Sequence, residues 1–195
     1  MNNKQVDQSL VLKVQSGDKS AFDLLVLKYQ HRVAKLVSRF IYNHAEVEDV
    51  TQEVFIKAYR ALANFRGDSA FYTWLYRIAV NTAKNYLVTM SRRPPSTDLE
   101  AGDAENMELG ASLRENATPE SNMLAKEIGD TVKKAVDQLP EDLKTAIVLR
   151  EIEGLSYEEI ASVMACPIGT VRSRIFRARE AIDSDLKPLI SDVDE

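Results

Sequence analysis

The sequence predicts an all-α protein of two small helical domains joined by a flexible acidic linker. Apolar residues recur every three or four positions before residue 94 and again after residue 121, which is the period of an amphipathic helix. The stretch between them begins with Pro94 and Pro95, is acidic and contains few large apolar residues. We therefore expect one domain over residues 1–93, a linker over 94–121 and a second domain over 122–195.

Three amphipathic helices are predicted near the beginning of the chain, over residues 6–15, 20–40 and 45–63. The apolar side of the third helix suits a protein core, and its polar side carries Asp49, Gln52, Glu53 and Lys57. A polar stripe of this kind is usually a solvated helix face, but it would also suit docking of a partner. The residues alone leave both interpretations open.

A fourth helix follows, and much of the aromatic content of the chain lies in or just before it, over residues 65–87. Gly67 predicts a turn, and Asp68 and Ser69 are favoured residues for a helix N-cap. At about 100° per residue, one face of this helix would be apolar and buried: Phe71, Leu75, Ile78, Ala79, Thr82 and Tyr86. The opposite face would be mostly polar: Thr73, Trp74, Arg77, Asn81, Lys84 and Asn85.

Trp74 is unusual because it lies on this polar face. One interpretation is that packed neighbours bury it, as they bury most tryptophans in large part. The other is that the face binds single-stranded nucleic acid, since rings stack on unpaired bases, amides bind base edges and cations neutralise phosphate. Phe65 and Arg66, just before the helix, would then form the wall of a pocket for an extruded base.

The second domain is predicted to begin with helices over residues 123–139 and 141–153. Ser156 and Glu159 form a capping box that starts a short helix ending near residue 164. Cys166 and Pro167 form a tight turn, and a final helix begins near Gly169. A short capped helix, a tight turn and a second helix constitute a helix-turn-helix motif.

The final helix combines an apolar stripe with a cluster of arginines. Val171, Ile175, Ala178 and Ile182 form the stripe, whereas Arg172, Ser173, Phe176 and Arg177 point away from it, with Arg174 and Arg179 at its edges. Arginines early in such a helix make bidentate contacts to guanine in the major groove, so we expect binding to double-stranded DNA. Arg150 would reach phosphate from the preceding helix. The alternative is a helical hairpin with a cationic, solvated face.

Composition excludes several other classes of function. The chain has one cysteine and two histidines, which excludes an internal disulfide and a Cys/His zinc site. The beginning of the chain is polar, and no apolar run approaches the roughly 20 residues that span a bilayer, so we expect a cytoplasmic protein. Asp49 and Glu53 lie four residues apart but lack a nearby histidine, and there is no P-loop pattern. We therefore expect no enzyme, no metal and no cofactor.

With these elements in view, the chain resembles the bacterial sigma factors of the extracytoplasmic-function group, especially those of the envelope-stress response. Three blocks in order carry the resemblance: DVTQEVFIKAYRAL at 49–62, FRGDSAFYTWLYRIAVNTAKNYL at 65–87, and LPEDLKTAIVLREIEGLSYEEIA at 139–161 followed by GTVRSRIFRARE at 169–180. The resemblance covers essentially the whole chain. It implies a sigma factor that binds core RNA polymerase and directs promoter-specific initiation.

The resemblance also implies roles for individual residues. The residues that match the segment docking on the clamp helices of the polymerase β′ subunit are Asp49, Gln52, Glu53 and Lys57. Those implied for recognising and opening the −10 promoter element are Phe65, Arg66, Gly67, Asp68, Ser69, Phe71, Tyr72, Trp74, Arg77, Asn81, Lys84 and Asn85, with a base flipped beside Phe65 and Asn81. Those implied for the −35 element are Arg150, Thr170, Arg172, Ser173, Arg174, Phe176 and Arg177.

The partners implied are core RNA polymerase, through its β′ and β subunits, promoter DNA, and an anti-sigma factor, often membrane-anchored. The linker would run through the polymerase, where its acidity either keeps it solvated or mimics nucleic acid. Residues 191–195 are also acidic, which does not favour DNA binding and has no explanation here. Two alternatives remain: a conventional helix-turn-helix regulator with an effector-sensing front domain, and an adaptor that binds only protein.

Overall fold

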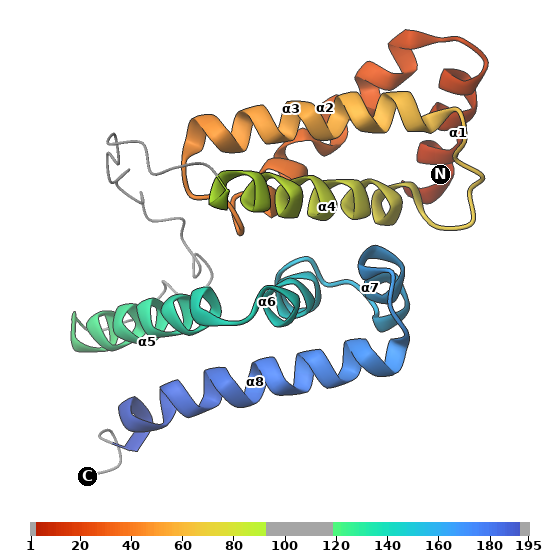
Figure 1. Cartoon of the computed structure of the whole chain (residues 1–195). Coiled ribbons are helices and arrows are strands. Elements are labelled where there is room, and N and C mark those ends of the chain that lie inside the picture. The colour runs from red at the N-terminus through yellow and green to blue at the C-terminus, as the bar shows by residue number, and fades with distance from the viewer. Residues whose placement is uncertain (1–2, 93–118, 192–195) are drawn as a thin grey trace. The chain divides into compact units, whose positions relative to one another are not determined.

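The computed structural model describes residues 3–92 and 119–191, and every regular element within these ranges is a helix (Figure 1). The all-α prediction is therefore confirmed for the part of the chain that the structure describes. The predicted linker lies almost entirely outside the described residues, as does the acidic tail. The contacts between residues divide the chain into two compact units. We call the one that holds α1–α4 the front unit and the one that holds α5, α6, η1 and α8 the back unit.

The front unit consists of α1 (Asn3–Gln15), α2 (Lys19–Val37), α3 (His44–Leu62) and α4 (Phe71–Ser91). Asp18 caps α2 by accepting hydrogen bonds from the backbone N–H groups of Ser20 and Ala21, and Asn43 caps α3 in the same way. The Ser20 hydroxyl also donates to Asp18, which holds the pKa of that carboxyl below its usual value. Local capping therefore sets where these two helices begin.

The core of the front unit lies where α2, α3 and α4 meet. α4 packs against both α2 and α3, and α1 packs mainly against α2; α3 and α4 run side by side in Figure 1. The largest side chains that this packing buries completely are Tyr76, Leu25, Leu36, Leu62 and Leu75. Removing such a side chain from water is worth about 1.5–3 kcal/mol, so this apolar contact is the main source of the unit's stability.

Several helix boundaries differ from those predicted: α1 begins at Asn3 rather than at residue 6, and two further differences have a physical explanation or consequence. α2 ends at Val37 rather than at residue 40, although Phe40 and Ile41 remain buried. α4 begins at Phe71, and its N-cap is Ala70, which provides no side-chain hydrogen bond, rather than Asp68 or Ser69. The physical reason is that tertiary packing stabilises this helix start more than capping does, since Phe71 is buried among aromatic neighbours.

The back unit contains α5 (Pro119–Gln138), α6 (Glu141–Ile147) and α8 (Ile168–Ser191), and both α5 and α6 pack on α8. The predicted helix over 141–153 is continuous, but its second half is a π-helical segment, η1 (Val148–Ile152). Glu153 N–H donates to the carbonyl of Val148 at 3.2 Å, which is the wider π-helical spacing. Gly154, with φ 67°, then ends the helix as predicted.

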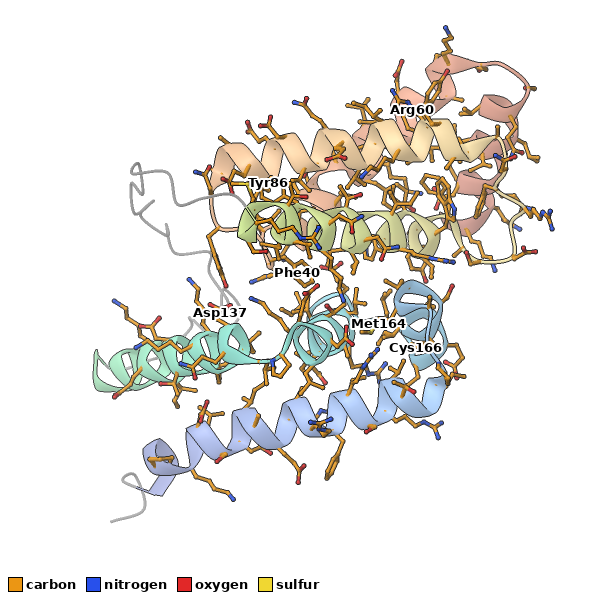
Figure 2. All side chains as sticks on the ribbon, viewed as in Figure 1. Phe40, Arg60, Tyr86, Asp137, Met164 and Cys166 are labelled. Carbon is orange, nitrogen blue, oxygen red and sulfur yellow. The ribbon has the colours of Figure 1, made fainter. Side chains whose placement is uncertain are left out.

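The predicted short helix, turn and second helix are present as α7 (Tyr157–Met164), residues 165–167 and α8. α7 begins directly after Ser156, the predicted N-cap. The turn includes Ala165 in the left-handed region at φ 50°, and Figure 2 shows Cys166 in the same turn. α8 contains Pro188 close to its end.

A buried polar contact joins α1 to α2. Asp7 is 3% exposed, accepts a hydrogen bond from the Tyr29 hydroxyl at 2.6 Å and pairs with the Lys28 ammonium at 2.5 Å. Burial and this hydrogen bond both raise the pKa of Tyr29 well above its usual value. The contact fixes the position of α1, because a buried carboxylate is stable only while it keeps its partners.

We expect Asp7→Ala to lower the free energy of unfolding by about 2 kcal/mol, because it leaves the Tyr29 hydroxyl buried without its acceptor. Tyr29→Phe should cost about 1 kcal/mol, and the double variant less than the sum of the two. Urea unfolding followed by fluorescence measures all three, since the only tryptophan, Trp74, lies in α4 of the front unit. Additive losses would show that the two side chains do not interact.

Candidate nucleic-acid interfaces

An aromatic cluster surrounds the start of α4. The ring of Phe65 lies 5.0 Å from that of Trp74 and 6.3 Å from that of Phe71, and the rings of Phe71 and Trp74 lie 5.7 Å apart. Phe71 is buried, whereas Phe65 and Trp74 are each half-buried. Neighbours therefore pack on the Trp74 ring, as the first interpretation expects, and part of the ring stays open, which is compatible with the second interpretation.

A polar row continues from this cluster along the exposed side of α4. Arg77, Asn81 and Asn85 are all exposed, and Lys84 beside them is half-buried. At 1.5 Å of rise per residue the row extends about 16 Å from Trp74 to Asn85. This length suits a few unpaired nucleotides, with a ring for stacking at one end and amides and cations along the rest.

The buried side of α4 is wider than predicted, and the assignment of Thr73 to the polar face is wrong. Thr73 is 1% exposed, and Tyr76, Val80 and Ala83 are also buried, whereas Ile78 and Tyr86 are only half-buried. The cause is that α4 packs against two helices, α2 and α3, so more than one stripe of its surface is covered. Tyr86 appears in Figure 2 toward the end of α4.

The loop before α4 presents its polar residues to solvent. Arg66, Gly67 and Asp68 are exposed, and Ser69 is half-buried. Gly67 has φ 78°, in the left-handed region where residues with a Cβ are strained, so this turn requires glycine. Tyr72, early in α4, is half-buried and its ring lies 6.3 Å from that of Tyr76.

The polar stripe predicted on α3 is accessible. Asp49, Gln52 and Glu53 are exposed, while Lys57 is half-buried, pairs with Glu53 at 2.7 Å and lies 3.4 Å from the Thr82 hydroxyl of α4. The sequence pattern missed Ile56, which is 50% exposed between Glu53 and Lys57. Single exposed apolar side chains are common on protein surfaces, so Ile56 is compatible with both interpretations of the stripe.

In the back unit, the buried and exposed sides of α8 are those that the sequence pattern predicted. Val171, Ile175 and Ala178 are buried and Ile182 is half-buried. Arg172, Ser173, Phe176 and Arg177 are exposed, and Thr170 at the start of the helix is half-buried. Phe176 is 62% exposed, which is unusual for a large aromatic side chain and leaves its ring free to meet a ligand.

The other candidate arginines have partners within the back unit. Arg174 donates to Asp142 of α6 and lies 3.4 Å from the Cys166 sulfur, and Arg179 pairs with Glu151 at 2.6 Å. The hydrogen bond from Arg179 to Glu151 raises the pKa of that guanidinium. These contacts connect α8 to α6 and to η1, so two arginines of the cluster have acidic partners within the unit, and Arg179 remains exposed while it is paired.

Tyr157 is a residue that the sequence pattern missed. Arg150, in η1, donates to the backbone carbonyl of Leu155 at 2.8 Å and stacks over the Tyr157 ring at 4.8 Å. Arg172, on α8, stacks over the same ring at 5.7 Å. One ring thus orients two cations from different elements, and no sequence spacing could have revealed this, because the π-helical segment places Arg150.

Among the described residues, no group of three or more His, Cys, Asp and Glu side chains could hold a metal ion. Within the same ranges, no helix is long and apolar enough to cross a bilayer.

Two family models match the chain. Residues 25–93 match sigma-70 region 2, and residues 130–182 match sigma-70 region 4. The first range includes α3, the loop and α4, and the second includes η1, α7 and the arginine-bearing part of α8.

The similar proteins of known name include sigma factors of nearly the same length. The extracytoplasmic-function RNA polymerase sigma-E factor of Escherichia coli K12 is 63% identical over 190 residues, which is 97% of this chain and 99% of the relative. The RNA polymerase sigma-H factor of Pseudomonas aeruginosa is also 63% identical over 190 residues, which is 97% of this chain and 98% of that protein.

Two solved structures resemble the chain over most of its length. CnrH, in complex with the cytosolic domain of CnrY, matches with a TM-score of 0.67 and 26% identity over 94% of this chain and 98% of that one. The sigma factor RpoE of Bartonella quintana, in complex with the anti-sigma factor NepR, matches with a TM-score of 0.62 and 25% identity over 85% of this chain and 96% of that one.

We expect Tyr157→Leu to weaken binding to duplex DNA by about three- to tenfold, because Arg150 and Arg172 lose the ring that orients them. Tyr157→Phe is the matched control, since it keeps the ring, and it should bind as the unchanged protein does. Fluorescence anisotropy with a duplex that the protein recognises measures both variants at one fixed salt concentration. Equal binding by all three proteins would show that the stacking has no part in recognition.

Proposed function

The chain belongs to the sigma-70 family of bacterial sigma factors, in its extracytoplasmic-function group, and we propose how its surfaces divide the work of transcription initiation. As a member of this family it directs promoter-specific initiation and is not an enzyme. We assign polymerase binding to α3, −10 recognition and opening to the loop and α4, and −35 recognition to α8. The observation that carries the proposal is the half-exposed Phe65–Trp74 pair at the head of the Arg77–Asn81–Asn85 row.

The proposed site for core RNA polymerase is the exposed stripe of α3, formed by Asp49, Gln52, Glu53 and Lys57, and its target is the β′ clamp helices. Ile56 lies within the stripe and would add an apolar contact to the charged ones. The β subunit is proposed as a second contact. Because the stripe and the exposed row of α4 belong to different helices, polymerase and DNA need not compete for the same side chains.

At the −10 element, capture of unpaired bases would bias the duplex toward opening. The proposed contacts are the loop residues Phe65, Arg66, Gly67, Asp68 and Ser69, and on α4 Phe71, Tyr72, Trp74, Arg77, Asn81, Lys84 and Asn85. Each base stacked on an aromatic ring is worth about 1–3 kcal/mol, against a mean of about 1.4 kcal/mol for each lost DNA stacking step. A few captured bases therefore balance the melting without nucleotide hydrolysis.

At the −35 element, the exposed residues Arg172, Ser173, Phe176 and Arg177 are proposed to contact base edges in the major groove. Arg150, Thr170 and Arg174 are proposed to support them. Arg150 and Arg174 already have intramolecular partners, so we infer that they contact phosphate with their remaining donors. Phosphate contacts orient the helix on the duplex, and base contacts provide the specificity.

We propose further that an anti-sigma factor inhibits the protein. Support comes from the similar structure of Bartonella quintana RpoE, which was solved with the anti-sigma factor NepR. The inhibitor is proposed to be membrane-anchored, the sigma factor to act in the cytoplasm, and the response to concern envelope stress. The matched ranges 25–93 and 130–182 support proposed domains over 1–93 and 122–195, with 94–121 as the linker.

Family membership decides against the conventional helix-turn-helix regulator with an effector-sensing front domain. The direct test is transcription in vitro on a supercoiled template with core polymerase, with and without the protein, and with permanganate probing for unpaired bases. Initiation that depends on the protein, together with an opened −10 region, is the expected result. Protein-dependent initiation without unpaired −10 bases would remove the role proposed for α4.

We expect Asn81→Ala to reduce open-complex formation about tenfold, because an amide contact to a captured base is lost. Affinity for core polymerase should not change, since Asn81 lies on α4 and the docking stripe on α3. Permanganate reactivity at −10 and competition for core polymerase separate the two effects. Unchanged opening would refute the role of Asn81.

Arg177→Ala should cost about 1–3 kcal/mol of discrimination between the −35 sequence and a mismatched one, if Arg177 contacts a base. Arg179→Ala is the matched control on the same helix, because Arg179 pairs with Glu151 instead. Binding of matched and mismatched duplexes at several salt concentrations makes the comparison. An equal loss on both duplexes would make Arg177 a phosphate contact.

A further inference from the structure

We propose that α1 positions the loop that would recognise the −10 element, and that Gln15 is the residue through which it does so. This inference rests on the function proposed above for that loop. Gln15 is the last residue of α1, far from Phe65 in sequence, and it lies outside the range 25–93 that matches region 2. Gln15 is a positioning residue, because it contacts the backbone of the loop and not the proposed DNA-binding side chains.

The geometry joins three elements at one amide. The Gln15 side-chain nitrogen lies 2.9 Å from the carbonyl oxygen of Leu62 and 2.9 Å from that of Phe65. A glutamine amide has two N–H donors, so it can serve both acceptors at once. Leu62 is the last residue of α3, and its carbonyl lacks a partner further along that helix. The amide therefore binds both the end of α3 and the start of the loop.

These two hydrogen bonds reinforce a turn that is already present. The Phe65 N–H donates to the Leu62 carbonyl at 3.1 Å, which closes residues 62–65 into a turn. Gln15 bridges the two carbonyls at the ends of this turn. It thereby restricts the direction in which the chain leaves α3. This restriction also fixes the backbone position from which the Phe65 side chain extends.

The ring of Phe65 is held separately, by α4. It packs at 5.0 Å on Trp74 and at 6.3 Å on Phe71. Phe71 in turn packs at 5.6 Å on Tyr29, whose hydroxyl donates to Asp7 of α1. α1 thus supports the aromatic cluster by two routes, one through the Gln15 amide to the backbone and one through Asp7 and Tyr29 to the rings.

The functional consequence follows from preorganisation. A loop that must be ordered when it captures a base binds that base more weakly than a loop already held in place. Loss of two hydrogen bonds to backbone carbonyls should weaken capture about tenfold, because each contributes modestly and their effects combine. Binding to core polymerase should not change, because the docking stripe faces solvent elsewhere on α3.

Gln15→Met is the decisive variant, since methionine has nearly the same length and shape but no N–H donors. Gln8→Met is the matched control, because it makes the same change on the exposed surface of the same helix. Gln15→Asn is a milder second variant, whose amide is one methylene shorter and cannot reach both carbonyls. Thermal unfolding of the three full-length variants establishes that each is folded.

Three measurements on the full chain test the proposal. The first is the affinity of the protein bound to core polymerase for a labelled single strand with the non-template −10 sequence of a promoter mapped by in vitro transcription, compared with a scrambled strand. The second is the affinity for core polymerase. The third is acrylamide quenching of Trp74, the only tryptophan, which reports on the cluster without DNA.

We expect Gln15→Met to bind the −10 strand about tenfold more weakly, to bind core polymerase as before, and to show stronger quenching of Trp74. Gln15→Asn should lie between it and the unchanged protein, and Gln8→Met should match the unchanged protein. Unchanged strand binding and quenching in Gln15→Met would overturn the proposal. Equal losses for the strand and for core polymerase would also overturn it, by showing a general structural effect.

A failure of the proposed function would look different. If the unchanged protein with core polymerase did not prefer the −10 strand to the scrambled one, the role of the loop in recognition would be refuted, and the recognition role of Gln15 with it. Trp74 quenching that rises in Gln15→Met but not in Gln8→Met would still establish that Gln15 holds the cluster.

Discussion

The packing of α4 against both α2 and α3 is the constraint on which the front unit depends. It buries Leu75, Tyr76 and Ala79 completely, and so it fixes the rotation of the helix about its axis. Once that rotation is fixed, Arg77, Asn81 and Asn85 must face solvent. The buried contacts of Leu75, Tyr76 and Ala79 thus determine which side chains can meet DNA, although these three residues are not among the proposed DNA contacts. A helix held on one side only could rotate, and the exposed row would lose its alignment.

The back unit divides its arginines between structure and recognition. Arg174 and Arg179 bind acidic side chains of neighbouring elements, although Arg179 is exposed like Arg172 and Arg177, and Arg174 is also proposed to contact phosphate. Ion pairs of this exposure contribute little to stability singly. Their effect is directional, because they fix the face that α8 presents. The π-helical segment has a similar effect, since it brings Arg150 against the ring of Tyr157, where Arg172 also stacks.

A sigma factor with these surfaces would gain selectivity from several modest contacts. Stacking of a few bases, two or three arginine contacts in the major groove and a polymerase-binding stripe are each worth only a few kcal/mol. Only their combination on one promoter, with polymerase present, would favour initiation. Such a division makes positioning as important as contact. In the front unit, α1 illustrates this point, because Gln15 and Asp7 support the aromatic cluster from outside the region that would bind DNA.

The sequence by itself determined the helical class, the helix-turn-helix and most of the exposed row of α4. It did so because helical periodicity, caps and helix breaks depend on residues that are close together in the sequence. It also predicted the exposure of Arg172, Phe176 and Arg177 from a single apolar stripe. Tertiary structure alone decided the burial of Thr73, the start of α4 at Phe71, the π-helical segment and the contacts of Gln15 and Tyr157. These depend on which distant elements meet, since α4 is covered by two helices and Gln15 reaches a carbonyl 50 residues away. A local sequence pattern contains no information about contacts between elements that are distant in the chain.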